Sequence, residues 1–259
     1  MKRYVALGSS MAAGPGIPPR APGSPRAAMR SARNYPHLLA EDLGLDLVDV
    51  TYSGATTAHV LTDRQNGTAP QLTALDGTED LVTITVGGND IAYVPGMYVA
   101  TLPGALRLLP VVGGRLRDVL DPARRELSLD KVADSLVTVG ERVRALAPNA
   151  RALFVEYLTL LPPSGMKAPP LKREHADLAR HLADRLAELT AKAAAATGCE
   201  VVRVAEASSA HHAWSDDPWT VGATLPLPGR PLAYHPNAAG MRAVTDLIRA
   251  HLDSAGSTG

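Results

Sequence analysis

Four short segments of the chain carry the residue types that transfer of an acyl group requires. They are Gly8-Ser9-Ser10, Ser53-Gly54, Gly87-Gly88-Asn89-Asp90 and His235-Pro236-Asn237. A serine hydroxyl attacks a carbonyl carbon effectively only when a base takes its proton, and an imidazole can do so near neutral pH. We therefore predict that Ser10 is a nucleophile and that His235 is its base.

Such an attack places negative charge on the carbonyl oxygen, so hydrogen-bond donors must stand where that charge develops. The predicted donors are the Ser10 N–H, the Gly54 N–H and the side-chain amide of Asn89. Asp90 is expected to brace its loop rather than to react. Taken alone, each residue has an ordinary interpretation, as a helix cap, a turn glycine, an Asx turn or a surface histidine. Their coincidence near the ends of predicted strands and helices favours a catalytic site.

The elements that must position these residues follow an alternating pattern. Short runs rich in Val, Ile, Leu and Phe predict buried strands at residues 3–7, 45–50, 80–86, 151–158 and 200–204. Helical patterns occupy residues 34–43, 129–146, 171–197 and 236–252. This alternation predicts a parallel sheet with helices on both faces. Ligands of such sheets bind beyond the carboxyl ends of the strands, where the first three polar segments lie.

Together, the four segments resemble the sequence blocks of the SGNH (GDSL-like) hydrolase family, in the same chain order. The resemblance spans residues 4–240. It implies a serine esterase that hydrolyses carboxylic esters through an acyl-serine intermediate and needs no cofactor. It assigns the nucleophile to Ser10 and the base to His235, with Gly54 and Asn89 in the oxyanion hole. The implied fold is a three-layer α/β/α, flavodoxin-like domain of about five parallel strands, over residues 1–259.

The sequence departs from the family pattern in two places. Ser9 stands where the family's Gly-Asp-Ser block usually has its Asp, which is a mild change. Leu232 stands where an Asp usually precedes the base by three residues and holds its imidazole.

Three explanations for the missing Asp stay open. The backbone carbonyl of Leu232 could accept the His235 Nδ1–H, which would make a Ser–His dyad. Asp216 or Asp217 could instead reach the base from the preceding loop, or the site could be catalytically impaired. A carbonyl fixes the tautomer of the imidazole, but it stabilises imidazolium less than a carboxylate does.

Two segments break the alternation of strands and helices. Residues 14–26 contain five prolines and are predicted to form a rigid loop. Residues 91–121 are apolar with several Pro and Gly, and they could be an inserted lid or a peripheral helical hairpin. An acyl-chain pocket formed by this segment would favour lipid or short-chain acyl esters as substrates. The resemblance implies sugar O-acetyl groups as the second choice, as in a carbohydrate O-acetyl esterase, and thioesters come third. The alternative function is a non-catalytic ligand-binding protein on the same fold.

Composition limits the other classes of function. The 259 residues are 46% hydrophobic and 20% charged, as in a globular protein, and their formal net charge is zero. A neutral chain argues against a general nucleic-acid binder, which needs a basic face. We expect a small-molecule ester substrate, no nucleic-acid partner, no metal and no cofactor. The single cysteine, Cys199, excludes an intramolecular disulfide and is expected to be a small buried hydrophobe.

Neither a signal peptide nor a membrane span is apparent. The apolar run near the N-terminus is short, and prolines and an arginine interrupt the most apolar stretch, residues 98–112. We predict a cytoplasmic location, which the lone cysteine supports, with a trimmed secreted form as the alternative. The excess of Arg over Lys, with abundant Ala, Gly and Pro, is typical of a GC-rich bacterial genome.

Overall fold

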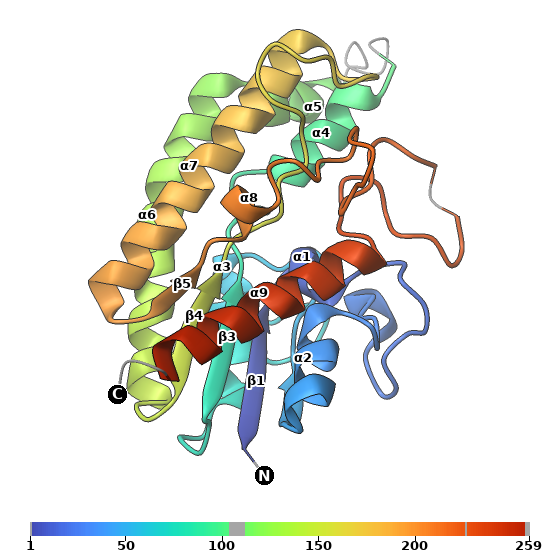
Figure 1. Cartoon of the computed structure of the whole chain (residues 1–259). Coiled ribbons are helices and arrows are strands. Elements are labelled where there is room, and N and C mark those ends of the chain that lie inside the picture. Colours follow the sequence, from blue (N-terminus) through green and yellow to red (C-terminus); the bar gives the residue numbers. More distant parts are fainter. Residues whose placement is uncertain (1, 104–111, 226, 257–259) are drawn as a thin grey trace.

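A single parallel sheet lies at the centre of the molecule (Figure 1). The computed structural model describes residues 2–103, 112–225 and 227–256. The strands are β1 (Arg3–Gly8), β2 (Asp46–Asp49), β3 (Leu81–Thr85), β4 (Arg151–Val155) and β5 (Glu200–Val202). They pair in the order β2-β1-β3-β4-β5, and every pairing is parallel. This is the flavodoxin-like strand order, so the predicted fold class is confirmed.

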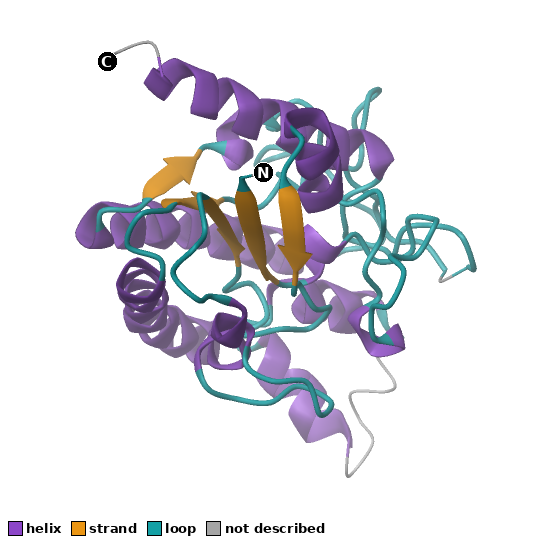
Figure 2. Ribbon diagram, turned by 90° about the horizontal axis from the view of Figure 1, so that it is seen from below, coloured by secondary structure: helices purple, strands orange, loops and turns teal. Residues whose placement is uncertain are grey.

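Helices cover both faces of this sheet (Figure 2). The longer ones are α2 (Tyr35–Leu43), α6 (Pro122–Leu146), α7 (Arg173–Thr197) and α9 (Ala238–Gly256). The shorter ones are α1 (Ser10–Ala13), α3 (Thr57–Leu61), α4 (Tyr93–Thr101), α5 (Val112–Leu120) and α8 (Val204–Ala207), with 3₁₀ turns at Arg26–Ala28 and Gln71–Ala74. Helices α2 and α9 pack on one face of the sheet, whereas α6 and α7 pack on the other.

The alternation of side chains along β1 explains the two layers of core. Tyr4 and Ala6 belong to the apolar cluster that includes α2 and α9, while Val5 and Leu7 belong to the cluster that includes α6 and α7. All four side chains are fully buried. Successive side chains of a strand point to opposite faces, so a central strand covered on both sides must be apolar throughout.

Two helix boundaries differ from the prediction because of capping side chains. Helix α9 begins two residues after Pro236, since Asn237 accepts the Gly240 N–H through its side-chain oxygen at 2.9 Å. Helix α6 begins well before the predicted Leu129, since Asp121 caps it and a proline occupies its first position.

The segment predicted as a lid or hairpin is helical where the structure describes it. It contains α4 and α5, which pack against each other, and α4 also packs on α7. Residues 104–111 of this segment lie outside the described residues, and movement of a lid stays a prediction. No helix in the described ranges is long and apolar enough to cross a membrane.

Candidate active site

The two residues predicted to be nucleophile and base meet at the carboxyl end of the sheet. Ser10 is the first residue of α1 and follows β1 almost directly, while His235 comes just before α9. The Ser10 Oγ lies 2.9 Å from the His235 Nε2, although 225 positions separate them in the sequence. Only 7% of Ser10 and 5% of His235 are exposed to solvent. Sequence reasoning thus identified a pair that the fold brings into hydrogen-bond contact.

The acceptor for the other ring nitrogen is a backbone carbonyl, but it is not that of Leu232. The His235 Nδ1 lies 2.8 Å from the carbonyl oxygen of Ala233, so the predicted position was wrong by one residue. The reason is Tyr234, whose φ of 58° places it in the left-handed region and turns the Ala233 carbonyl back toward the ring. Two backbone hydrogen bonds hold this turn, from Tyr234 N–H to Val221 and from Val221 N–H to His235.

Neither predicted displaced acid contacts the base among the described residues. The Asp217 carboxylate lies 3.2 Å from the Nδ1 of His211, and its side chain is 77% exposed. That same histidine ring stacks on Trp219 with ring centroids 3.8 Å apart. The structure gives Asp216 no hydrogen bond or ion pair with His235, so a displaced triad is not the arrangement seen.

Burial controls the charge of the base. Desolvation lowers the pKa of His235 to about 4, and the hydrogen bond to Ala233 offsets this only in part. No charged side chain of the described chain contributes to this shift. The imidazole is therefore neutral at physiological pH, which is the form that can take a proton from Ser10.

The predicted oxyanion donors come from three adjacent loops at this end of the sheet. The Ser10 and Gly54 N–H groups have no acceptor within the described chain, and a φ of 79° at Gly54 favours glycine there. Asn89 donates from its side-chain amide to the Ala55 carbonyl at 2.9 Å, which ties it to the Gly54 loop. One amide hydrogen of Asn89 then remains for a ligand.

Asp90 braces these loops. Its carboxylate accepts the Thr57 N–H at 3.1 Å and the Thr57 hydroxyl at 2.6 Å. Burial raises the pKa of the Asp90 carboxyl, while the two bonds from Thr57 oppose that shift. A carboxylate fully engaged with its neighbouring loop acts as a structural support, as the sequence suggested.

Two further residues organise the nucleophile loop and were not identified from the sequence. The Tyr157 hydroxyl lies 2.8 Å from the Ser9 Oγ and accepts the Gly88 N–H at 3.1 Å. Gly88 has no room for a side chain, because a Cβ would collide with the Tyr157 ring. Gln71 pairs with the backbone of Gly8, accepting its N–H at 2.7 Å and donating to its carbonyl at 3.0 Å.

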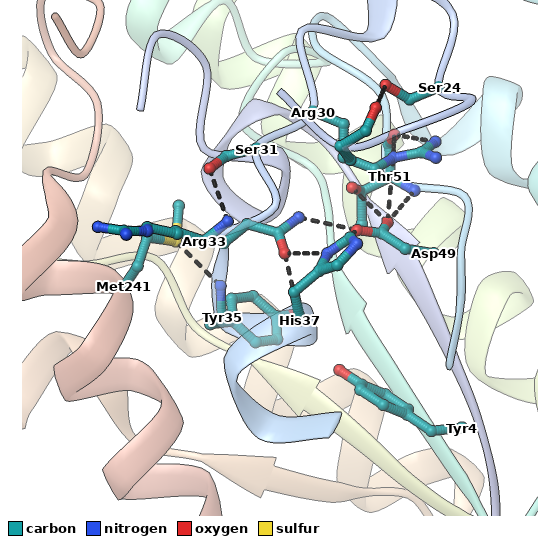
Figure 3. Close-up of polar contacts among 12 residues, drawn as sticks. Tyr4, Ser24, Arg30, Ser31, Arg33, Tyr35, His37, Asp49, Thr51 and Met241 are labelled. Atoms are coloured by element: carbon teal, nitrogen blue, oxygen red, sulfur yellow. Dashed lines mark hydrogen bonds and ion pairs between the residues drawn. The ribbon is translucent and has the colours of Figure 1, made fainter. Parts of the chain in front are cut away.

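A buried carboxylate, that of Asp49, is the centre of a second network of polar contacts (Figure 3). Asp49, at the end of β2, accepts the Thr51 N–H and hydroxyl and the Asn34 amide at 2.7–2.9 Å. The Arg30 guanidinium and the His37 imidazole each approach it to 3.3 Å. These contacts outweigh desolvation and keep the pKa of Asp49 below its usual value. Arg30 also donates to the Thr51 carbonyl and accepts the Ala21 N–H through its own carbonyl, so it links the proline-containing segment to the chain that leads to Gly54.

A cavity lies at α7 and the chain after β4, and neither Ser10 nor His235 lines it. Its volume is about 640 Å³, and α7, α8 and the segment after β4 line it. Tyr157 and Leu158 form part of the wall, whereas residues 91–121 contribute Tyr93 to it. Among the described residues, this cavity is built mainly from α7 and the chain after β4, and an acyl pocket formed by residues 91–121 stays a prediction.

Comparison with known proteins places this site in a family. Residues 6–243 match the GDSL-like Lipase/Acylhydrolase family. The chain belongs to this family. Lipase 2 of Streptomyces coelicolor is 33% identical over 252 residues, covering 94% of this chain and 83% of that protein. A lipase of Streptomyces rimosus is 30% identical over 238 residues, covering 92% of this chain and 81% of its own.

Solved structures resemble this GDSL-like hydrolase over nearly its whole length. The crystal structure of the extracellular lipase from Streptomyces rimosus has a TM-score of 0.79 and 27% identity, and covers 96% of this chain and 99% of its own. Phospholipase A1 from Streptomyces albidoflavus NA297 has a TM-score of 0.78 and 25% identity, with coverages of 96% and 98%. This GDSL-like hydrolase is a serine hydrolase of carboxylic esters.

Proposed function

We propose that this esterase works through a Ser10–His235 dyad whose imidazole is oriented by the Ala233 carbonyl. The observation that carries the proposal is the continuous hydrogen-bonded line from Ser10 Oγ through the imidazole to that carbonyl, at 2.9 and 2.8 Å. A carbonyl acceptor requires the proton to reside on Nδ1, which leaves Nε2 free to act as the base.

The chemical steps follow from this geometry. The His235 Nε2 takes the Ser10 hydroxyl proton while the Oγ attacks the acyl carbon, and the carbonyl electrons move onto its oxygen. The Ser10 and Gly54 N–H groups and the Asn89 amide receive that oxyanion. The tetrahedral intermediate then collapses, the ester C–O bond breaks, and Nε2–H gives its proton to the departing alcohol. Water, deprotonated by Nε2, repeats the sequence on the acyl-serine and releases the acid.

We propose lipid acyl esters as the substrate class. The support is the lipase and phospholipase A1 descriptions of the Streptomyces relatives, together with a cavity whose wall includes Tyr93, Leu158 and Leu160. A series of p-nitrophenyl esters of increasing chain length tests this choice. We expect kcat/KM to rise beyond the acetyl ester, and a maximum at acetyl would favour the carbohydrate O-acetyl esterase alternative.

Labelling with a fluorophosphonate probe tests the nucleophile. We expect the wild-type chain to be labelled at Ser10, and Ser10→Ala to lose both labelling and ester hydrolysis while its circular dichroism spectrum stays unchanged. A folded wild-type chain that resists the probe and hydrolyses no ester would instead support a non-catalytic ligand-binding protein.

The cellular location remains a prediction that experiment can decide. The sequence favours the cytoplasm, whereas the Streptomyces rimosus relative is described as an extracellular lipase. Fractionation of the native host, with an antibody to this chain, separates the two. Detection in the culture medium without a cytoplasmic marker would overturn the cytoplasmic assignment.

A further inference from the structure

One backbone oxygen beside the base accepts two hydrogen bonds. The Ala233 carbonyl receives the His235 Nδ1–H at 2.8 Å and the hydroxyl of Tyr98, also at 2.8 Å. A carbonyl oxygen has two lone pairs, so these two donors fill its capacity. The tyrosine comes from α4, in the segment that the sequence set apart as an insertion.

Tyr98 also contacts the residue that makes the turn. Its ring packs edge-on against Tyr234, with ring centroids 5.5 Å apart and an interplanar angle of 84°. Tyr234 is fully buried and holds its left-handed backbone although it is not a glycine. Burial raises the pKa of the Tyr98 hydroxyl, which keeps it protonated and able to donate. The Tyr98 hydroxyl contacts Ala233 and the Tyr98 ring contacts Tyr234, so both support the same turn before His235.

We propose that Tyr98 is a positioning residue for the base: it holds the Ala233 carbonyl that orients His235, and it links α4 to the dyad. This inference rests on the proposed role of His235 as the base. In a triad, a carboxylate would supply this orientation through its own side chain. Here the orienting group is a main-chain atom of a loop, so its direction depends on what the loop contacts.

Because Tyr98 shares the Ala233 oxygen with His235, its hydroxyl also affects how easily the imidazole is protonated. Both donated hydrogens converge on one oxygen, so the positive end of the Tyr98 hydroxyl lies close to the imidazole. Such a dipole disfavours imidazolium. The groups facing His235 are Ser10 at Nε2 and, through the carbonyl, Tyr98 at Nδ1, and no charged group of the described chain adds to them. Removing the hydroxyl should therefore loosen the carbonyl and also make the base easier to protonate.

Tyr98→Phe isolates the hydroxyl, because the ring that packs on Tyr234 is retained. We expect kcat to fall on the order of tenfold, a fraction of the 10²–10⁴ that a positioned acid–base group contributes. KM should change less than about twofold, and the acid limb of the kcat/KM profile should move to higher pH. Tyr4→Phe is the matched control: its hydroxyl lies 2.8 Å from the Thr83 hydroxyl in the core of the sheet, so its loss should leave both readouts unchanged.

The outcomes separate this inference from the proposed mechanism. If Ser10→Ala abolishes hydrolysis but Tyr98→Phe keeps the wild-type kcat and acid limb, the role of Tyr98 is refuted and the dyad stands. If Tyr98→Phe lowers kcat without moving the acid limb, and its urea midpoint falls in parallel, the residue acts only on the fold, which also refutes the inference. If Ser10→Ala retains hydrolysis, both proposals fail. Tyr98→Leu, which removes ring and hydroxyl, should reduce kcat further than Tyr98→Phe.

Discussion

Protonation of His235 gives the sharpest test of a dyad that lacks a carboxylate. A neutral carbonyl offers imidazolium less stabilisation than an Asp would, and the ring is almost fully buried. Acidification is the perturbation, because only the neutral ring can take the Ser10 proton. Activity should therefore fall where the free enzyme binds a proton at His235.

The pH at which activity falls follows from the lowered pKa of His235. Burial takes the pKa of His235 from an ordinary 6.5 to about 4, which corresponds to about 3 kcal/mol against the charged ring. We expect kcat/KM to stay constant from neutral pH to about pH 5 and to reach half its plateau near pH 4. Between pH 6.5 and 4 the unfolded chain binds a proton at this residue and the folded chain does not. The contribution of His235 to the free energy of unfolding is therefore complete above pH 6.5 and is lost as the pH falls from 6.5 to 4.

The assay is initial-rate hydrolysis of a short p-nitrophenyl ester, followed at the isosbestic wavelength of the product, at constant ionic strength. Return of each sample to neutral pH shows whether any loss is reversible. His251→Gln serves as a control, because this histidine pairs with Glu200 at 2.8 Å rather than with the site. A reversible acid limb centred near pH 6.5 or higher in the wild type would refute the reasoning, since it would require a stabilised imidazolium.

Four further substitutions test other residues in and around the site. Asn89→Ala should lower kcat on the order of 10²–10³-fold with little change in KM, because an oxyanion donor is lost; a loss below about fivefold would exclude that role. Asp216→Asn and Asp217→Asn should each keep kcat/KM within about twofold of wild type, and a collapse in either would identify a displaced acid. Asp49→Asn should lower the free energy of unfolding in urea by about 3 kcal/mol, because it removes the carboxylate that neutralises the largely buried Arg30 guanidinium, whereas the exposed Asp63→Asn should have almost no effect.

The sequence predicted the sheet and the dyad because both depend on patterns that are local in the chain. Buried parallel strands need continuous apolar runs, and the polar residues that follow them converge at one edge. The parallel strands and the capped start of α2 at Asn34 follow from such rules, whereas the flavodoxin-like strand order was implied by the family resemblance, which also supported the pairing of Ser10 with His235.

The groups that support the dyad could not be predicted in the same way. Ala233 replaces Leu232 as the source of the carbonyl because Tyr234 adopts a left-handed conformation, and a tyrosine gives no local signal of that. Tyr157 lies within the strand predicted over residues 151–158. In the structure β4 ends before it, and the Tyr157 hydroxyl therefore reaches Ser9. Tyr98 is distant in the sequence from the carbonyl it contacts, so its role depends on how α4 packs against the turn before His235.

The long sequence separation of the dyad has a consequence for the order of events during synthesis. The nucleophile is synthesised 225 residues before its base. The helix that follows the base packs against α2, and the sulfur of Met241 accepts the Tyr35 N–H there. A nascent chain therefore carries an unactivated serine until its C-terminal helix has docked. Acquisition of esterase activity should report completion of the whole fold, and the growing chain should not react with acyl esters in the cell.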